Sequence, residues 1–383
     1  MHLLDLSHTS HTRAQTGIQK VARALYHELT GHDQAHAITW DHYADTWREL
    51  APWELANLLA TSPGKTRGAR WPWPERVRSR WNRRGYASTL LPPSDGLIVP
   101  ELFSPAVARA LPRLAARSPK VAIFHDAIAL KLPELSPGGT VSRFPSYLQE
   151  LLQFDGIAAV SDDSRQTLLD YWAWLGVPNP PPVQTIPLGL DAASQTDVSP
   201  MGAVPPSILC VGSIEGRKNH IALLGAAEQL WNQGRRFNLR LIGMANTHTG
   251  KPAMQKIAAL QQAGRPLRYD GPVDEVTLES AYAECTFTVY PSLMEGFGLP
   301  VLESLSRGKP CICSAQGALG ESARAGGALT LAEMNLPSLA DAMEQLVLNP
   351  SLLRQLGTAA RARTYRSWSV YTGDLLDWMK TLP

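Results

Sequence analysis

The sequence has few cysteines, no long apolar run and almost no net charge. Its four cysteines, Cys210, Cys285, Cys311 and Cys313, fall in apolar strand-like stretches without the spacing of a disulfide framework or a zinc site. We therefore expect reduced, buried thiols and a cytosolic setting. No run of about eighteen apolar residues is present, and the N-terminus MHLLDLSHTS is too short and polar for a secretory signal. A formal net charge of +2 excludes binding of polyanions through overall charge.

The chain of 383 residues is too long for one ordinary core, and strand-like segments alternate with helix-like ones. The strand-like segments are continuous apolar runs, which is typical of parallel sheets covered by helices on both faces. A proline-rich stretch, residues 176–206, interrupts the alternation and predicts a linker. We therefore expect two α/β domains with parallel sheets: residues 1–190, joined by a C-terminal helix at about 368–383, and residues 205–365.

A pair of cations follows a strand in the expected second domain, at the edge where doubly wound sheets bind ligands. Arg217 and Lys218 come after the strand and a short turn that begins with Gly212 and Ser213. Cations at the start of a helix face an unfavourable macrodipole, and a bound anion such as a diphosphate would relieve it. The alternative is an exposed, solvated Arg–Lys pair.

Two glutamates, Glu295 and Glu303, flank the turn GFGLP at the start of another helix. Amide groups at a helix N-terminus attract anions, so the acids either cap the helix or hold a ligand whose anionic part lies on the turn. In the first domain, His125 ends a strand and is placed to polarise a hydroxyl or to stabilise developing charge. Gly17 opens the first helix and would let a ligand approach the backbone closely.

Several segments resemble the family 4 retaining glycosyltransferases, which have the GT-B fold of two Rossmann-like domains facing a central cleft. The resemblance rests on GSIEGRKN, on FHD, and on YPSLMEGFGLPVLE with its two glutamates eight positions apart. The segment TGIQKV is similar to a stretch of the members that build bacterial polysaccharides such as lipopolysaccharide, and IPLGLD is similar to the segment before the second domain. The resemblance implies a hexosyltransferase.

The site residues of that family can be placed on matching positions of this sequence. The resemblance implies that Glu303 binds the ribose hydroxyls of a nucleotide and that Glu295 binds hydroxyls of the transferred sugar. It implies that Arg217 and Lys218 neutralise the diphosphate and that His125 reaches the donor sugar. Ser213 stands where many members have an arginine, which leaves the phosphate charge to the Arg–Lys pair. The remaining expected donor contacts lie at Gly17, Gly212, Ser213, Val273, Phe297, Gly298 and Leu299.

The resemblance implies a reaction without metal or other cofactor, and the sequence lacks the D-x-D carboxylate pair of metal-using transferases. We expect front-side displacement, in which the leaving phosphate takes the proton of the acceptor. GDP-mannose is the first expectation for the donor, and other GDP-, dTDP- or UDP-linked hexoses and deoxyhexoses stay open. The acceptor would be a saccharide or a lipid-linked saccharide. The alternatives are a nucleotide-sugar epimerase and a non-catalytic nucleotide-sugar-binding protein.

Residues 65–86 combine eight Lys or Arg and one Glu with three tryptophans. Interleaved Trp and Arg are typical of contact with anionic lipid headgroups, so we expect a cytoplasmic protein with peripheral contact to the inner face of the plasma membrane. A solvated surface insertion is the alternative, and no nucleic-acid partner is expected. His8 and His11 follow the first strand, and we expect them to contact the acceptor rather than a metal, because the sequence shows no carboxylate partner for them.

Overall fold

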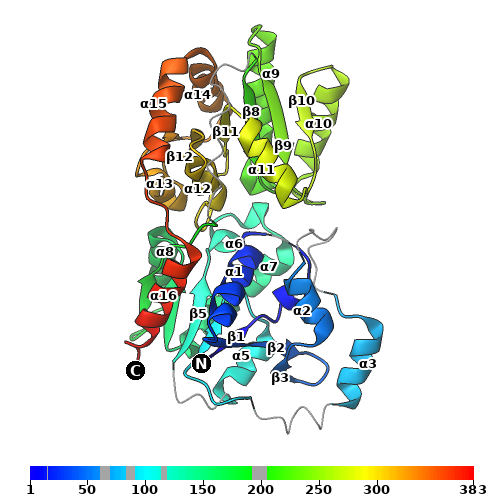
Figure 1. Ribbon diagram of the computed structural model, residues 1–383, viewed down its shortest axis with the longest axis vertical. Coiled ribbons are helices and arrows are strands. Elements are labelled where there is room, and N and C mark those ends of the chain that lie inside the picture. The colour runs from blue at the N-terminus through cyan, green and yellow to red at the C-terminus, as the bar shows by residue number, and fades with distance from the viewer. Residues whose placement is uncertain (15, 61–69, 83–90, 114–118, 192–204) are drawn as a thin grey trace. The chain divides into compact units, whose positions relative to one another are not determined.

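The computed structural model describes residues 1–14, 16–60, 70–82, 91–113, 119–191 and 205–383 (Figure 1). Its internal contacts divide the chain into two units. The first comprises Met1–Asp126, Ser142–Gly189 and Arg366–Pro383, and the second comprises Ala127–Val141 and Leu190–Tyr365. The sequence predicts a first domain that runs without interruption over residues 1–190. In the structure, Ala127–Val141 belongs to the second unit.

The first unit is built on a seven-stranded sheet of order β3-β2-β1-β4-β5-β6-β7. The expected parallel pairing is confirmed for the other neighbours, and β3 adds an antiparallel strand at one edge by pairing with β2. The strand pair β2 and β3 was not identified from the sequence. The strands are β1 (His2–Asp5), β2 (Ala35–Asp41), β3 (Thr46–Glu49), β4 (Leu97–Val99), β5 (Lys120–Phe124), β6 (Gly156–Ala159) and β7 (Val183–Thr185).

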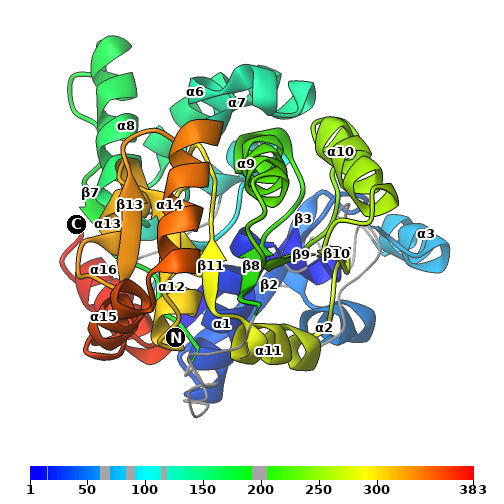
Figure 2. The same ribbon diagram turned by 90° about the horizontal axis from the view of Figure 1, so that it is seen from above.

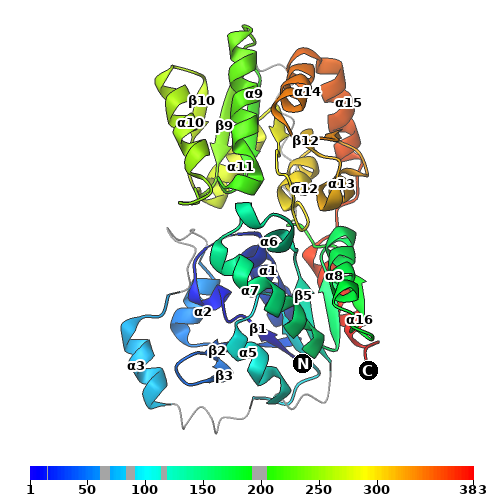
Figure 3. The same cartoon turned by 180° about the vertical axis from the view of Figure 1, so that it is seen from behind.

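Helices of the first unit pack on this sheet with apolar stripes. The predicted first helix is confirmed as α1 (Gly17–Gly31), and it buries Val21, Leu25 and Leu29 at helical spacing. The C-terminal helix α16 (Trp368–Met379) lies beside α1, as Figures 1 and 3 show. The others are η1 (Thr9–His11), α2 (Pro52–Leu58), α3 (Trp73–Trp81), α5 (Pro105–Ala110), η2 (Leu111–Arg113), α7 (Gly138–Glu150, which crosses the unit boundary), η4 (Leu151–Gln153) and α8 (Asp162–Trp174).

The second unit is built on a six-stranded sheet of order β10-β9-β8-β11-β12-β13, and its pairings are all parallel, as predicted. Crossovers through helices explain why its strands read as continuous apolar runs, since both faces are covered. The strands are β8 (Ser207–Val211), β9 (Asn238–Ile242), β10 (Leu267–Tyr269), β11 (Phe287–Val289), β12 (Cys311–Ser314) and β13 (Ala328–Leu331).

Alternate residues of β8 contribute side chains to two hydrophobic cores on opposite faces of this sheet. Ile208 and Cys210 join the core under α9 and α14, whereas Leu209 joins the core under α11, and Figure 2 shows these helices on opposite sides. The four cysteines are free and buried, as expected. The helices are α6 (Ile128–Lys131), η3 (Pro133–Leu135), η5 (Gly216–Lys218), α9 (His220–Asn232), α10 (Lys251–Gln262), α11 (Glu275–Glu284), α12 (Leu299–Ser306), α13 (Gly317–Ala323), α14 (Leu336–Leu348) and α15 (Pro350–Arg361).

Candidate active site

The loop after β8 is shaped by close contact between backbones. Gly212 has φ 156°, and a Cβ on Gly243, which follows β9, would lie 2.0 Å from the Gly212 carbonyl oxygen. Only glycine therefore allows the loops after β8 and β9 to touch there. Ile214 extends the sheet by a parallel bridge to Ala245, and the loop then turns into η5.

The predicted cations lie on η5, one turn before the helix on which the sequence placed them. Asn219 adopts a left-handed conformation with φ 53°, and α9 begins only at His220. Lys218 is buried at 7% exposure, so the alternative of an exposed, solvated pair is wrong for this residue. Arg217 keeps 23% of its side chain exposed. The Lys218 side chain is therefore inside the protein, whereas the Arg217 side chain stays partly accessible to solvent.

Glu295 joins the two cations into one cluster. Its carboxylate lies 2.6 Å from Lys218 Nζ and 2.9 Å from Arg217 Nη1, and the other Arg217 terminal nitrogen lies 2.9 Å from Glu215. Burial alone would raise the pKa of Glu295, but Lys218 and Arg217 outweigh it and lower that pKa to about 2. Burial lowers the pKa of Lys218 against the opposing effect of Glu295. Glu295 is therefore a permanently ionised acceptor of hydrogen bonds.

Tyr290 supports this cluster and was missed from the sequence. It follows β11 directly and is buried, with Lys218 Nζ 4.6 Å from its ring centroid and in contact with its hydroxyl. An ammonium group over an aromatic face is held electrostatically as well as by its ion pair. The available signal was the placement of a tyrosine immediately after a strand that faces the Arg–Lys turn.

The GFGLP turn exposes the start of α12. Gly298 has φ 97°, and a Cβ there would lie 2.9 Å from Leu319, so this position requires glycine. The turn is pinned by Ser322, whose hydroxyl donates to the Phe297 carbonyl at 2.6 Å. Pro300 has no N–H, and the amides of Val301 and Leu302 donate to the Gly298 carbonyl at 3.0 and 3.3 Å, so Leu299 supplies the amide at the start of this helix. The N-cap residue Gly298 makes no side-chain cap bond, and Glu295 pairs with Lys218 and Arg217.

Glu303 lies on α12, whose start at Leu299 is as predicted. It is the fifth residue of the helix and partly buried, and the Tyr282 hydroxyl donates to its carboxylate at 3.3 Å. Val273 packs on the apolar cluster that contains Tyr282. The structure thus places Glu303 beside Tyr282 and Val273 on the core cluster to which Tyr282 belongs, and it joins Arg217 and Lys218 through Glu295.

Two predicted site residues belong to the first unit. His125 is buried and donates from Nε2 to the Pro100 carbonyl oxygen at 2.7 Å, because a carbonyl can only accept. Burial lowers its pKa, so the imidazole is neutral and presents Nδ1 as an acceptor. Gly17 is the exposed first residue of α1, where backbone N–H groups have no intrahelical partner.

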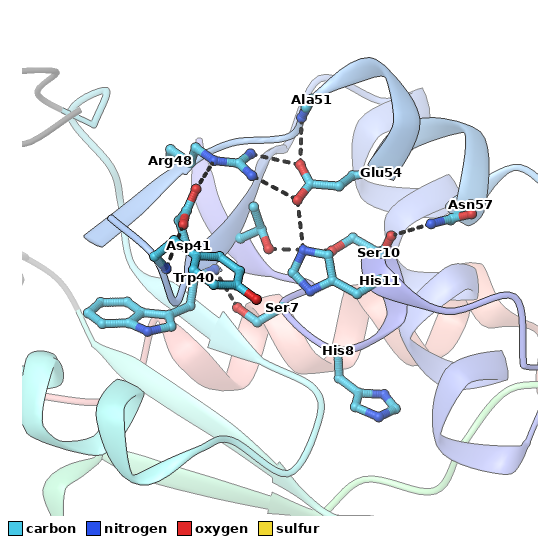
Figure 4. Close-up of polar contacts among 12 residues, drawn as sticks. Ser7, His8, Ser10, His11, Trp40, Asp41, Arg48, Ala51, Glu54 and Asn57 are labelled. Carbon is cyan, nitrogen blue, oxygen red and sulfur yellow. Dashed lines mark hydrogen bonds and ion pairs between the residues drawn. The ribbon is translucent and has the colours of Figure 1, made fainter. Parts of the chain in front are cut away.

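A second charged cluster lies at the carboxyl ends of β1 and β2 (Figure 4). Glu54 is held by Arg48 at 2.7 and 2.9 Å and by His11 Nε2 at 2.7 Å, and Arg48 Nε donates to Asp41 at 2.8 Å. Trp53 and Trp71 lie on the His11 ring, with centroids at 5.3 and 4.6 Å. The expectation that no carboxylate accompanies the two histidines is wrong. Among the described residues there is no group of three or more His, Cys, Asp or Glu fit to hold a metal.

His8 lies next to this cluster and is the more accessible of the two histidines. Its side chain is 43% exposed, and Gln19 Nε2 lies 3.2 Å from its Nδ1. Below it, Glu101 accepts from the backbone amides of His8 and Thr9 at 3.2 and 3.0 Å. Burial raises the pKa of Glu101 to about 7. This loop after β1 is therefore held by a carboxyl group that titrates near neutrality.

Comparison with known proteins relates most of the second unit to one protein family. Residues 198–363 match the family Glycosyl transferases group 1. The serotype-specific mannosyltransferase WbdA of Escherichia coli is 27% identical over 81% of this chain, but the match covers only 38% of that protein. The chain thus spans well under half the length of this relative. The O-antigen chain mannosyltransferase B of Escherichia coli is 29% identical over 68% of this chain and 70% of its own length.

A solved structure shows that the likeness extends to the whole fold. Sucrose-phosphate synthase from Thermosynechococcus elongatus superposes with a TM-score of 0.72 at 17% identity, covering 99% of this chain and 98% of that protein. Both units are included in this match, and the two-domain GT-B fold expected from the sequence is confirmed. None of the helices in the described parts of the chain combines the length and the apolar character needed to cross a lipid bilayer.

Proposed function

We propose that this chain, whose residues 198–363 match the group 1 glycosyl transferases and which has the GT-B fold, transfers a sugar from a nucleotide-sugar to a saccharide or lipid-linked saccharide acceptor in the synthesis of a bacterial surface polysaccharide. The observation that carries the proposal is the cluster of Arg217, Lys218 and Glu295. Two fixed cations beside one ionised carboxylate match a ligand that carries a diphosphate next to a polyhydroxylated sugar.

Each member of the cluster has a role that follows from its chemistry. Lys218 and Arg217 would bind the diphosphate oxygens and stabilise the negative charge that grows as the leaving group departs. Glu295, whose pKa is about 2, would accept hydrogen bonds from hydroxyls of the transferred sugar and could not serve as a proton donor. In the unliganded protein the carboxylate neutralises the cations, so the diphosphate would share them with Glu295.

The nucleoside would lie over Glu303, whose carboxylate accepts from the hydroxyl of the buried Tyr282. Glu303, partly buried beside that tyrosine, offers a carboxylate to the two ribose hydroxyls, and Val273 offers apolar surface and backbone to the base. The amide of Leu299 at the start of α12 would add a phosphate contact from a helix N-terminus, and the contact expected of Gly17 stays a prediction from the sequence. Gly212 and Ser213 would let the ligand approach the loop after β8.

We expect the transfer to proceed with retention by front-side displacement. The bond from the anomeric carbon to the phosphate oxygen breaks, the bond to the acceptor oxygen forms on the same face, and the acceptor proton passes to the leaving phosphate. The contact of His125 with the donor sugar stays a prediction from the sequence. No resident metal or cofactor is assigned a role in this scheme. The donor is a substrate, and two relatives named as mannosyltransferases favour GDP-mannose.

The test begins with ligand binding and ends with the product. A thermal-shift series with GDP, UDP and dTDP, each with and without EDTA, should give the largest stabilisation with GDP and no dependence on the chelator. Incubation with GDP-mannose should release mannose slowly even without acceptor, and proton NMR of the earliest product should show the donor's anomeric configuration. Stabilisation by none of these nucleotides, together with no hydrolysis of any nucleotide-sugar, would contradict the proposed function.

A further inference from the structure

The helix α3 (Trp73–Trp81) presents an apolar stripe to solvent. Trp73 is 74% exposed, Val77 38% and Trp81 85%. These residues are spaced by four, so at about 100° per residue they fall within roughly 80° of one another on the helix surface. Two almost fully exposed tryptophans on one stripe form a continuous apolar patch, which in soluble proteins marks an interaction surface.

Basic side chains border this stripe. Arg70, Arg76, Arg78 and Arg80 are all exposed, and Glu75 is the acid of the segment, so residues 70–81 carry four positive charges and one negative charge, a net +3. At about 100° per residue, Arg76 falls on one side of the apolar stripe and Arg78 on the other. Tryptophan favours the interfacial zone of a bilayer, and arginine favours lipid phosphates, so both parts of the surface suit the same partner.

The opposite side of α3 is anchored to the first unit. Ser79 is buried and hydrogen-bonds the Asp41 carboxylate. Trp71, at 9% exposure, packs against Tyr43 with ring centroids 5.2 Å apart, and Arg80 lies 5.3 Å over the Tyr43 ring. Figures 1 and 3 show α3 at the rim of the unit, beyond β3. The helix is thus fixed through the cluster of Figure 4 while its Trp stripe faces outward.

We infer that α3 docks the protein on an anionic membrane surface. The occupant is identified by charge complementarity, because a stripe of Trp bordered by Arg fits the boundary between acyl chains and anionic headgroups. The inference goes beyond the transfer reaction and does not depend on it. A docked α3 would also bring the lipid surface near the loop of His8, because both segments contact the cluster that contains His11 and Asp41.

The test uses the full chain and vesicles. Co-sedimentation at low ionic strength would compare phosphatidylcholine vesicles with vesicles that also contain phosphatidylglycerol. Wild-type protein should bind the anionic vesicles and release on addition of salt. The double variant Trp73→Ala/Trp81→Ala should bind at least about tenfold more weakly, and Arg76→Glu/Arg78→Glu should remove the preference for anionic lipid. Because Trp73 and Trp81 are exposed, the thermal midpoint of the tryptophan variant should stay at the wild-type value.

Trp174 provides the matched control. It is 79% exposed on α8, but the charges of Asp162–Trp174 sum to −2, from three Asp and one Arg. Trp174→Ala should leave vesicle binding within about twofold of wild type. The inference is wrong if wild-type protein ignores anionic vesicles at low salt, or if Trp174→Ala costs as much as the double variant. It is also wrong if the double variant instead abolishes self-association or RNA binding while vesicle binding is absent.

Discussion

Each unit holds a cluster of charges just past the carboxyl ends of its strands, and the two clusters differ in how they are buried. In the first unit, Arg48, Glu54 and Asp41 have side chains that are 7%, 0% and 0% exposed. In the second, Arg217, Lys218 and Glu295 keep 23%, 9% and 10%. In the first cluster the Glu54 carboxylate is hydrogen-bonded to both Arg48 and His11, so partners within the protein fix its orientation.

The difference separates a structural network from a binding site. Charges withdrawn fully from water must be matched by partners of the protein itself, because an unmatched buried ion is strongly destabilising. In the second cluster Arg217 keeps 23% of its side chain exposed, so it can exchange a protein carboxylate for an anionic ligand. We therefore expect substitutions in the first cluster to change folding free energy, and substitutions in the second to change ligand binding and turnover. Four experiments test this division.

The largest effect is expected from Arg48→Met. It would leave Glu54 and Asp41 buried without their shared cation, which typically costs about 3–5 kcal/mol of unfolding free energy. Urea denaturation followed by tryptophan fluorescence would measure it. Arg78→Met is the control, because that side chain is 67% exposed and should change stability by no more than about 0.5 kcal/mol. Equal stabilities of the two variants would contradict a structural role for the first cluster.

Lys218→Ala should act on turnover. Loss of a cation aimed at developing charge typically lowers the rate about 100- to 1000-fold, and Glu295 would keep Arg217 as its partner. Transfer or donor hydrolysis would be followed under single-turnover conditions. Lys256→Ala, on α10 and paired with Glu228, is the matched control and should stay within about twofold. Near-wild-type turnover by Lys218→Ala would remove Lys218 from the proposed site.

The contrast between the clusters also marks what the sequence could predict. The cluster of the second unit could be predicted, because Arg217, Lys218 and Glu295 lie in short segments next to strands that are clear apolar runs in the sequence. The parallel order of its sheet and the start of α12 followed from the same patterns. The cluster of the first unit could not be predicted from the sequence. Its members come from η1, β2, β3 and α2, and only the antiparallel pairing of β2 with β3 brings Asp41 and Arg48 together.

Tyr290 and Tyr282 show a second limit. Each supports a residue that the sequence did identify, Lys218 in one case and Glu303 in the other. Their contribution depends on side-chain direction across neighbouring strands and helices, which residue spacing does not report. Burial of Lys218 and neutrality of His125 are likewise properties of the packed surroundings.

A smaller effect is expected for Glu101, and it depends on pH. Its pKa is about 7 in the folded protein against an ordinary value of 4.5, so the folded state binds the proton more tightly. The contribution to stability is therefore fully present below pH 4.5 and is lost as the pH rises through 7, with an upper limit of about 3 kcal/mol. Glu101→Gln should flatten the fall in urea midpoint across this range. An unchanged slope would show that Glu101 is ionised in the folded protein.

The smallest effect separates the two glutamates of the second unit. Glu303→Gln should weaken binding of free nucleotide about tenfold, because a charge-assisted hydrogen bond to ribose is replaced by a neutral one. Glu295→Gln should leave that affinity unchanged or slightly improved, because the carboxylate that shares Arg217 and Lys218 with the diphosphate is removed. It should nevertheless lower transfer, since the sugar hydroxyls lose their ionised acceptor. Calorimetry with free nucleotide beside single-turnover transfer distinguishes the two roles. If both variants weakened free nucleotide equally, Glu295 would act on the nucleotide and not on the sugar, and the second cluster would be a nucleotide site alone.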